Sequence, residues 1–161
     1  MIRSVTLIAA SALLGAAEDA AAPLVRVAQI VKNCDSYRGK TVRAAGYLDD
    51  CADNDCQLFA DKKAIGISAD AWKAVRNAKR DSAEWPKAWN RLAAVAPIGI
   101  GYDETFDRKA ASLQHSYVVI TGRVSKDSCT GFATGTDRAF GIDPIDIRPW
   151  TPADGAPANM Q

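Results

Sequence analysis

Residues 30–48 read Ile-Val-Lys-Asn-Cys-Asp-Ser-Tyr-Arg-Gly-Lys-Thr-Val-Arg-Ala-Ala-Gly-Tyr-Leu. Just before and into this segment, apolar residues recur at helical spacing: Leu24, Val27, Ala28 and Val31. Asn33 and the polar residues after it end the predicted helix, because short polar side chains compete for backbone hydrogen bonds. Arg38-Gly39-Lys40 then predicts a turn in which the glycine adopts positive φ. We expect a short helix that leads through a tight turn into a strand.

The predicted strand after the turn alternates between two faces. Val42, Ala44 and Leu48 share one face, and Arg43, Ala45 and Tyr47 share the other. Gly46 interrupts the inner face, and a glycine inside a strand commonly marks a bulge or a bend. A bent first strand is what a small closed barrel requires.

The order of residues across the helix, turn and strand resembles the opening of small exported bacterial domains with an OB-type barrel. The residues that carry this resemblance are Ile30, Asn33, Tyr37, Gly39, Lys40, Val42, Gly46 and Leu48. It implies a mainly β fold with some helix, namely a five-stranded OB-like Greek-key barrel with a short N-terminal helix. The group is functionally diverse or uncharacterised, so the resemblance implies no catalytic residues.

The later elements follow from periodicity and turn residues. The expected further strands are 57–60, 64–68, 117–125 and 140–147, with a bulge at Asp143-Pro144. A helical insertion is expected between the third and fourth strands, with Trp72, Trp85 and Trp89 on its buried face. A tryptophan stripe of this kind is more typical of a core than of a ligand platform.

The two ends of the chain predict processing and a tail. Arg3, the apolar run 5–14 and Gly15-Ala16-Ala17 are typical of a signal peptide over 1–17, cleaved before Glu18. The alternative is a membrane anchor, but the run is shorter than the about 20 residues that span a bilayer. Residues 151–161 are expected to be a flexible tail, which leaves a single OB-like domain over 18–150. The mature protein is therefore expected in the periplasm or secreted.

The charge balance argues against a general affinity for nucleic acid. The chain has 20 basic and 19 acidic residues, hence a net charge of +1. The predicted signal peptide contains Arg3 and no acidic residue, so the mature chain is neutral, 19 minus 19. Binding to phosphate backbones depends on clustered Lys and Arg.

Four cysteines in an exported chain predict two disulfides, with three pairings open. Cys51 and Cys56 flank a polar turn and would join the ends of a hairpin loop. In an OB barrel the first and fourth strands are antiparallel neighbours, so the resemblance favours Cys34 with Cys129. A metal site is the competing interpretation, but Cys-x-x-Cys pairs are absent.

Two groups of residues could bind a metal or act in catalysis. The acidic group Asp49, Asp50, Asp53 and Asp55 could hold calcium, but it lacks the glycine and the twelfth-position glutamate of an EF-hand loop. A solvated hairpin tip is therefore favoured. His115 is the only histidine, and its position implies no nucleophile or acid partner, so a surface or capping role is favoured. We expect no catalytic residues, no metal and no cofactor.

The function expected from these features is binding. An exported, disulfide-stapled barrel without a catalytic set suggests a module that recognises a protein, peptide or glycan. The candidate binding surface comprises Phe59, Arg43 and Tyr47. Phe59 alone is a weak platform for stacking bases, so nucleic acid is not the expected ligand. The alternative is a secreted metal-dependent nuclease-like OB-barrel enzyme that uses the aspartates, Arg43 and a metal.

Overall fold

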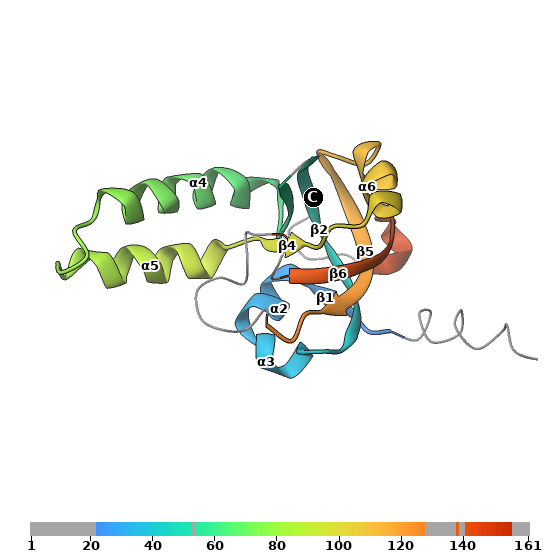
Figure 1. Ribbon diagram of the computed structural model, residues 1–161, viewed down its shortest axis with the longest axis horizontal. Helices are drawn as coiled ribbons and strands as arrows, with labels where there is room; N and C mark the ends of the chain where they lie inside the picture. The colour runs from blue at the N-terminus through green and yellow to red at the C-terminus, as the bar shows by residue number, and fades with distance from the viewer. Residues whose placement is uncertain (1–21, 53, 128–137, 139–140, 156–161) are drawn as a thin grey trace, which may run out of the picture.

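The computed structural model describes residues 22–52, 54–127, 138 and 141–155. Figure 1 shows two parts: a β-barrel body with short helices around it, and a pair of long antiparallel helices that projects from one side. The predicted signal peptide and the end of the predicted tail lie outside the described residues.

Five strands close the barrel. In order around it they are β2 (Thr41–Ala52), β3 (Asp55–Phe59), β4 (Ile98–Ile100), β6 (Gly141–Pro149) and β5 (Ser116–Val124). The additional β2–β5 pairing closes the ring, and a further strand, β1 (Leu24–Arg26), lies parallel to β2. The prediction of a mainly β fold with a closed five-stranded barrel is therefore confirmed.

The β2–β5 pairing joins parts of the chain that are far apart in sequence. The two strands are antiparallel from Thr41 opposite Arg123 to Leu48 opposite Ser116. This is the adjacency that the Cys34–Cys129 prediction required between the first strand and the strand that ends near Ser125. It also brings the end of β2 next to the start of β5, where the candidate site lies.

Gly46 is required by a close approach of neighbouring elements. A Cβ atom at this position would lie 2.4 Å from the Phe59 carbonyl oxygen, 2.8 Å from Val27 Cγ2 and 2.9 Å from Leu58 Cγ. The preceding turn contains Gly39 at φ 71°, as predicted. Gly39 therefore has the backbone conformation that the sequence suggested. Gly46 is required by close packing, and the bend predicted there stays a prediction.

The predicted third strand, 64–68, is wrong, because these residues belong to helix α4 (Lys62–Asn77). Asp61 caps this helix by accepting a hydrogen bond from the Ala64 amide at 2.9 Å. The buried residues of α4 recur at helical spacing: Ala64, Ser68, Ala71 and Val75. The third barrel strand is β4, so the long helical insertion lies between the second and third barrel strands, not between the third and fourth.

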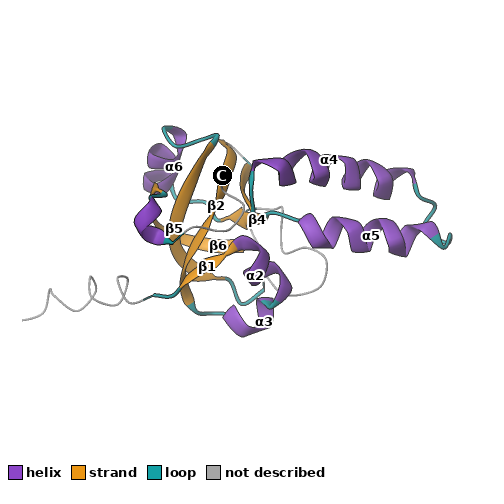
Figure 2. Cartoon of the chain, turned by 180° about the vertical axis from the view of Figure 1, so that it is seen from behind, coloured by secondary structure: helices purple, strands orange, loops and turns teal. Residues whose placement is uncertain are grey.

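The projecting hairpin consists of α4 and α5 (Glu84–Val95) and has its own small core. Trp89 makes edge-to-face contacts with Trp72 and Trp85, at ring-centroid distances of 5.7 Å and 5.4 Å. The two views agree that the pair extends away from the barrel (Figures 1 and 2). The tryptophans pack as predicted, but within the hairpin and not in the barrel.

Three short helices complete the barrel body: α2 (Val27–Lys32), α3 (Cys34–Tyr37) and α6 (Glu104–Ala111). Val27 and Ile30 of α2 are buried in the main hydrophobic core together with the inner residues of the barrel strands. Leu24, which was predicted to be helical, lies in β1 because the segment pairs with β2 before the helix begins. Helix α6 follows β4 and packs on β2 and β6.

The last strand has the predicted bulge. Gly122 pairs with Pro144 while Thr121 pairs with Asp146, so Ile145 is the extra residue on β6.

The predicted flexible tail begins with a 3₁₀ helix, Pro152–Asp154, which Arg148 holds through its ion pair with Asp154. In the described part of the chain, no helix is long and apolar enough to cross a membrane.

Candidate functional site

His115 occupies an unusual backbone position between α6 and β5. Its φ is 58°, and among the described residues it is the only one other than glycine with positive φ. Positive φ is uncommon for residues with side chains, although histidine is enriched among the exceptions. The His115 amide donates a hydrogen bond to the Leu48 carbonyl at 2.9 Å, which holds the residue beside the end of β2.

Both ring nitrogens of His115 face carboxylates of β2. Nε2 lies 3.3 Å from Asp50 Oδ1, and Nδ1 lies 3.7 Å from Asp49 Oδ1. One donor atom from each of the three residues lies within 4.8 Å of the others. Asp49 is partly buried, whereas Asp50 and His115 are exposed. A histidine and two carboxylates are a donor set that a divalent cation can use.

The backbone around this cluster is held by covalent and hydrogen bonds. Cys51 and Cys56 form the predicted disulfide, directly after Asp50 in β2. In the turn before β5, the Gln114 side-chain amide donates to the Cys51 carbonyl at 2.9 Å. The segments that carry the aspartates and the histidine are therefore tied to each other immediately beside the cluster.

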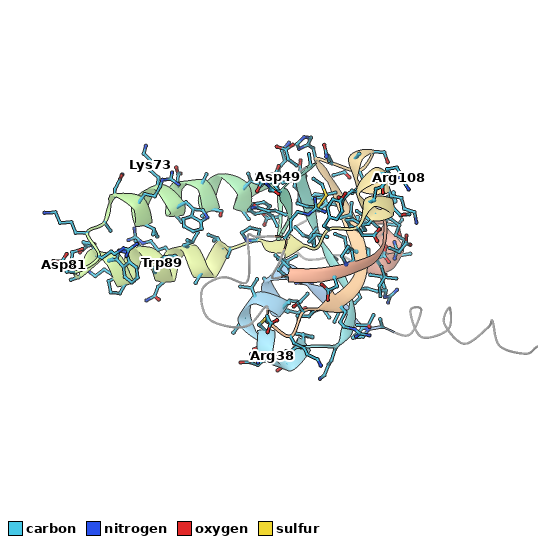
Figure 3. All side chains as sticks on the ribbon, in the orientation of Figure 1. Arg38, Asp49, Lys73, Asp81, Trp89 and Arg108 are labelled. Atoms are coloured by element: carbon cyan, nitrogen blue, oxygen red, sulfur yellow. A yellow bond between two sulfur atoms is a disulfide. The ribbon has the colours of Figure 1, made fainter. Side chains whose placement is uncertain are left out.

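The two aspartates also line a small pocket of about 160 Å³ with Asp55 and Gln57. Of the predicted acidic group, Asp49, Asp50 and Asp55 thus gather at one place, and Asp53 lies outside the described residues. The Asp49 label in Figure 3 lies on the barrel body, away from Asp81 at the tip of the hairpin. The cluster therefore belongs to the barrel and not to the projecting helices.

Sequence reasoning missed the relation between His115 and the aspartates. The interpretation that His115 has no acidic partner is wrong, because β2 and β5 pair in antiparallel register up to Leu48 and Ser116. The next residues at this end are Asp49, which is still in β2, and His115, the turn residue that directly precedes β5. The signal was present in the predicted first-to-fourth strand pairing, which places the end of one strand beside the start of the other.

A second pocket, of about 410 Å³, lies where β4 ends and β6 begins. It is lined by Gly101, Tyr102, Asp103, Arg138, Asp143 and Pro144. Tyr102 is 72% exposed, and Ile145, which follows Pro144, is 51% exposed. These are two of the three large hydrophobic side chains recorded as exposed among the described residues, and Ile67 on α4 is the third.

Arg138 forms the buried wall of this second pocket. Its guanidinium lies 5.2 Å from the centre of the Tyr102 ring. It donates to the carbonyls of Ile100 and Gly101, both at 3.1 Å, and to Asp107 Oδ1 at 2.6 Å. These bonds compensate the buried charge and hold the guanidinium against the ring. No pattern in the sequence singled out Tyr102 or Arg138.

The candidate binding surface Phe59, Arg43 and Tyr47 is brought to one face of the sheet. Tyr47 pairs directly with Phe59 across β2 and β3, and Arg43 lies four residues earlier on β2. The two rings are only 5% and 4% exposed, and Tyr47 packs edge-to-face on Tyr117 at 5.2 Å. Arg43 Nε donates to the Ala22 carbonyl at 2.9 Å. Rings this buried do not offer stacking surfaces to a ligand.

The residues of the nuclease alternative are not gathered into one site. Arg43 precedes Asp49 by six residues on the same strand. Since a strand rises by about 3.3 Å per residue, the two lie about 20 Å apart along β2. Arg43 is therefore too distant to assist chemistry at the aspartates.

The second predicted disulfide joins Cys34 to Cys129. Cys34 is disulfide-bonded, and none of the described cysteines is free. Its predicted partner, Cys129, lies outside the described residues. The Cys34–Cys129 pairing therefore stays a prediction.

Comparisons with models of known protein families, with curated proteins and with solved structures gave no match.

Proposed function

We propose that the protein is an exported binding module, and that its ligand site is the pocket lined by Tyr102, Arg138, Asp103 and Asp143. The observation that carries the proposal is the exposed Tyr102 ring at a pocket of about 410 Å³. Pockets of about 300–1,000 Å³ with an aromatic wall and a few polar groups are typical of ligand sites. The proposed ligand is a protein, peptide or glycan segment.

The chemistry of the pocket supports a ligand with both an apolar face and polar groups. The exposed Tyr102 ring offers apolar contact area. The carboxylates of Asp103 and Asp143 can accept hydrogen bonds from hydroxyl or amino groups. Asp103 already accepts the Phe106 amide at 2.7 Å as the cap of α6, which limits its freedom to move. Sugar rings and polar peptide side chains combine these two properties.

We also propose that the closed five-stranded barrel is of the OB type. Support comes from the strand order and from the parallel pairing of β4 with β6, the only parallel pair among the barrel strands described. In OB barrels, ligands bind across one face and its flanking loops. Export is supported by the Cys51–Cys56 disulfide, because such bonds persist in oxidising compartments. Mass spectrometry of secreted protein should show a chain that begins at Glu18.

The direct test is binding to panels of glycans and peptides by the parent protein and by Tyr102→Ala. The expected result is saturable binding to one class of ligand, weakened at least tenfold by Tyr102→Ala. Ile67→Ala is the matched control, because it also removes an exposed apolar side chain but lies on α4. Equal loss in both variants, or unchanged binding by Tyr102→Ala, would contradict the proposed site.

The nuclease alternative has a separate assay. Phosphodiester cleavage by purified protein would be measured with and without calcium. We expect no metal-dependent turnover, because Arg43 lies about 20 Å from the aspartates along β2. Turnover that is abolished by Asp50→Asn would reject the binding-module proposal.

A further inference from the structure

We propose that Asp49, Asp50 and His115 bind a divalent cation of the zinc class. This site is distinct from the Tyr102 pocket and does not depend on it, since the two pockets share no lining residue. The proposal rests on the mixed donor set, on the spacing of its atoms and on the hydrogen bonds that hold the turn at His115 against β2.

The spacing of two donor atoms fits a shared cation. Zinc binds imidazole nitrogen and carboxylate oxygen at about 2.0–2.2 Å, so two ligands of a tetrahedral site lie about 3.3–3.5 Å apart. His115 Nε2 and Asp50 Oδ1 are 3.3 Å apart. The cation can therefore be held by these two atoms with little change in their separation.

Asp49 can contribute in either of two ways. Its carboxylate oxygen lies within 4.8 Å of the other donor atoms, so a small rotation would bring it to the same cation. In its present position it faces Nδ1 at 3.7 Å, where it can orient the imidazole ring. Carboxylates that orient a metal-bound histidine commonly affect metal affinity by about 10–100-fold. Asp49 therefore matters to affinity in both arrangements.

The surroundings favour a cation and leave it accessible. In the described part of the chain, no Lys or Arg forms an ion pair with Asp49 or Asp50, and His115 is their recorded partner. Asp55 and Gln57 line the adjoining pocket and provide further oxygen atoms. Solvent can fill the remaining coordination positions. A cation can thus reach the site from solvent, and the side chains around it offer carboxylate oxygens.

The histidine decides which cation is expected. Calcium and magnesium prefer oxygen ligands only, whereas zinc, nickel and copper accept imidazole nitrogen readily. The possible calcium site in the sequence comprised aspartates only. With His115 included, the expected order of affinity is zinc above calcium and magnesium.

The test uses untagged, disulfide-bonded protein and zinc ions alone. Because His115 is the only histidine, every imidazole NMR signal belongs to it. Calorimetry should show one zinc ion per chain, and zinc should shift the imidazole signals in parallel with the binding heat. The same titrations with calcium and with magnesium should give affinities at least tenfold lower.

Three variants complete the experiment. His115→Ala and Asp50→Asn should each weaken zinc binding at least tenfold, while Asp70→Asn, an exposed aspartate on α4, should leave it unchanged. Circular dichroism and urea unfolding check that each variant is folded. The NMR titration of the parent protein needs no variant and decides the question by itself. Absence of zinc binding, binding that leaves the imidazole signals unmoved, or calcium affinity equal to that of zinc would overturn the proposal.

Discussion

Replacement of Gly46 by alanine tests the close packing of the first barrel strand against its neighbours. The added methyl group would lie 2.4 Å from the Phe59 carbonyl oxygen, a backbone atom that cannot move without displacing β3. It would also lie within 3 Å of Val27 Cγ2 and Leu58 Cγ, both buried in the main core. The substitution therefore adds volume where two backbones and two side chains already meet.

The expected cost follows from two opposing effects. Overpacking of a core typically costs about 1–3 kcal/mol, and a backbone obstacle favours the upper half of that range. Alanine loses less chain entropy on folding than glycine does. This difference offsets about 0.4–1 kcal/mol of the cost. The free energy of unfolding should thus fall by about 2 kcal/mol, with Tm lower by about 6 °C for a chain of this size. Gly46→Val, which is larger, should cost more.

Gly66→Ala is the matched control, because the same methyl group has the opposite effect there. Gly66 lies inside α4, and apart from its chain neighbours and the backbone of the adjoining helical turns no atom lies within 4 Å of an added Cβ. Alanine in an exposed helix position is favoured over glycine by about 0.5–1 kcal/mol. Urea and thermal unfolding should show a lower free energy of unfolding for Gly46→Ala and a higher one for Gly66→Ala. If Gly46→Ala were as stable as the parent, the close approach of β2 and β3 would be refuted.

Three further predictions concern other elements. Replacing Cys51 and Cys56 together by serine should cost about 2 kcal/mol of unfolding free energy, because the bridge closes a short loop, and a loss above about 4 kcal/mol would contradict this. Trp89→Ala should destabilise the hairpin by about 2 kcal/mol, seen as faster amide exchange in α4 and α5 but not in the barrel strands. The hydrogen bond from Arg148 lowers the pKa of Asp154, so this group stabilises the fold above about pH 4 and less as pH falls through the lowered value. The stability difference between the parent and Asp154→Asn should therefore shrink in acid, and a pH-independent difference would reject the ion pair.

The local features that the sequence predicted well are those with a single strong cause. Gly39 adopts positive φ, and Gly46 lies where an added side chain would crowd the inner face of the strand, both as the residue types suggested. The bulge at the Asp143-Pro144 step was indicated by the change of parity along the last strand. The Cys51–Cys56 bridge was expected because the two cysteines flank a polar turn between two predicted strands.

The features that were missed depend on competition or on tertiary structure. The segment 64–68 contains β-branched residues at alternate positions and also an N-cap at Asp61, and the helix prevailed because it continues through the buried Ala71 and Val75. The His115 cluster arises from strands that meet although their residues are more than 60 positions apart in the sequence. The Tyr102 pocket combines residues that follow β4 with others in β6 and with Arg138, an arrangement that no local spacing encodes.

Site-specific photo-crosslinking tests most directly the central claim, that the Tyr102 pocket is the ligand site. A benzophenone amino acid would replace Tyr102 in one variant and Ile67 in another, both exposed large side chains. After irradiation of cells that produce each variant, mass spectrometry would identify the adducts. We expect one reproducible adduct at position 102 and none at position 67. Adducts at both positions alike, or at position 67 only, would contradict the proposed binding site.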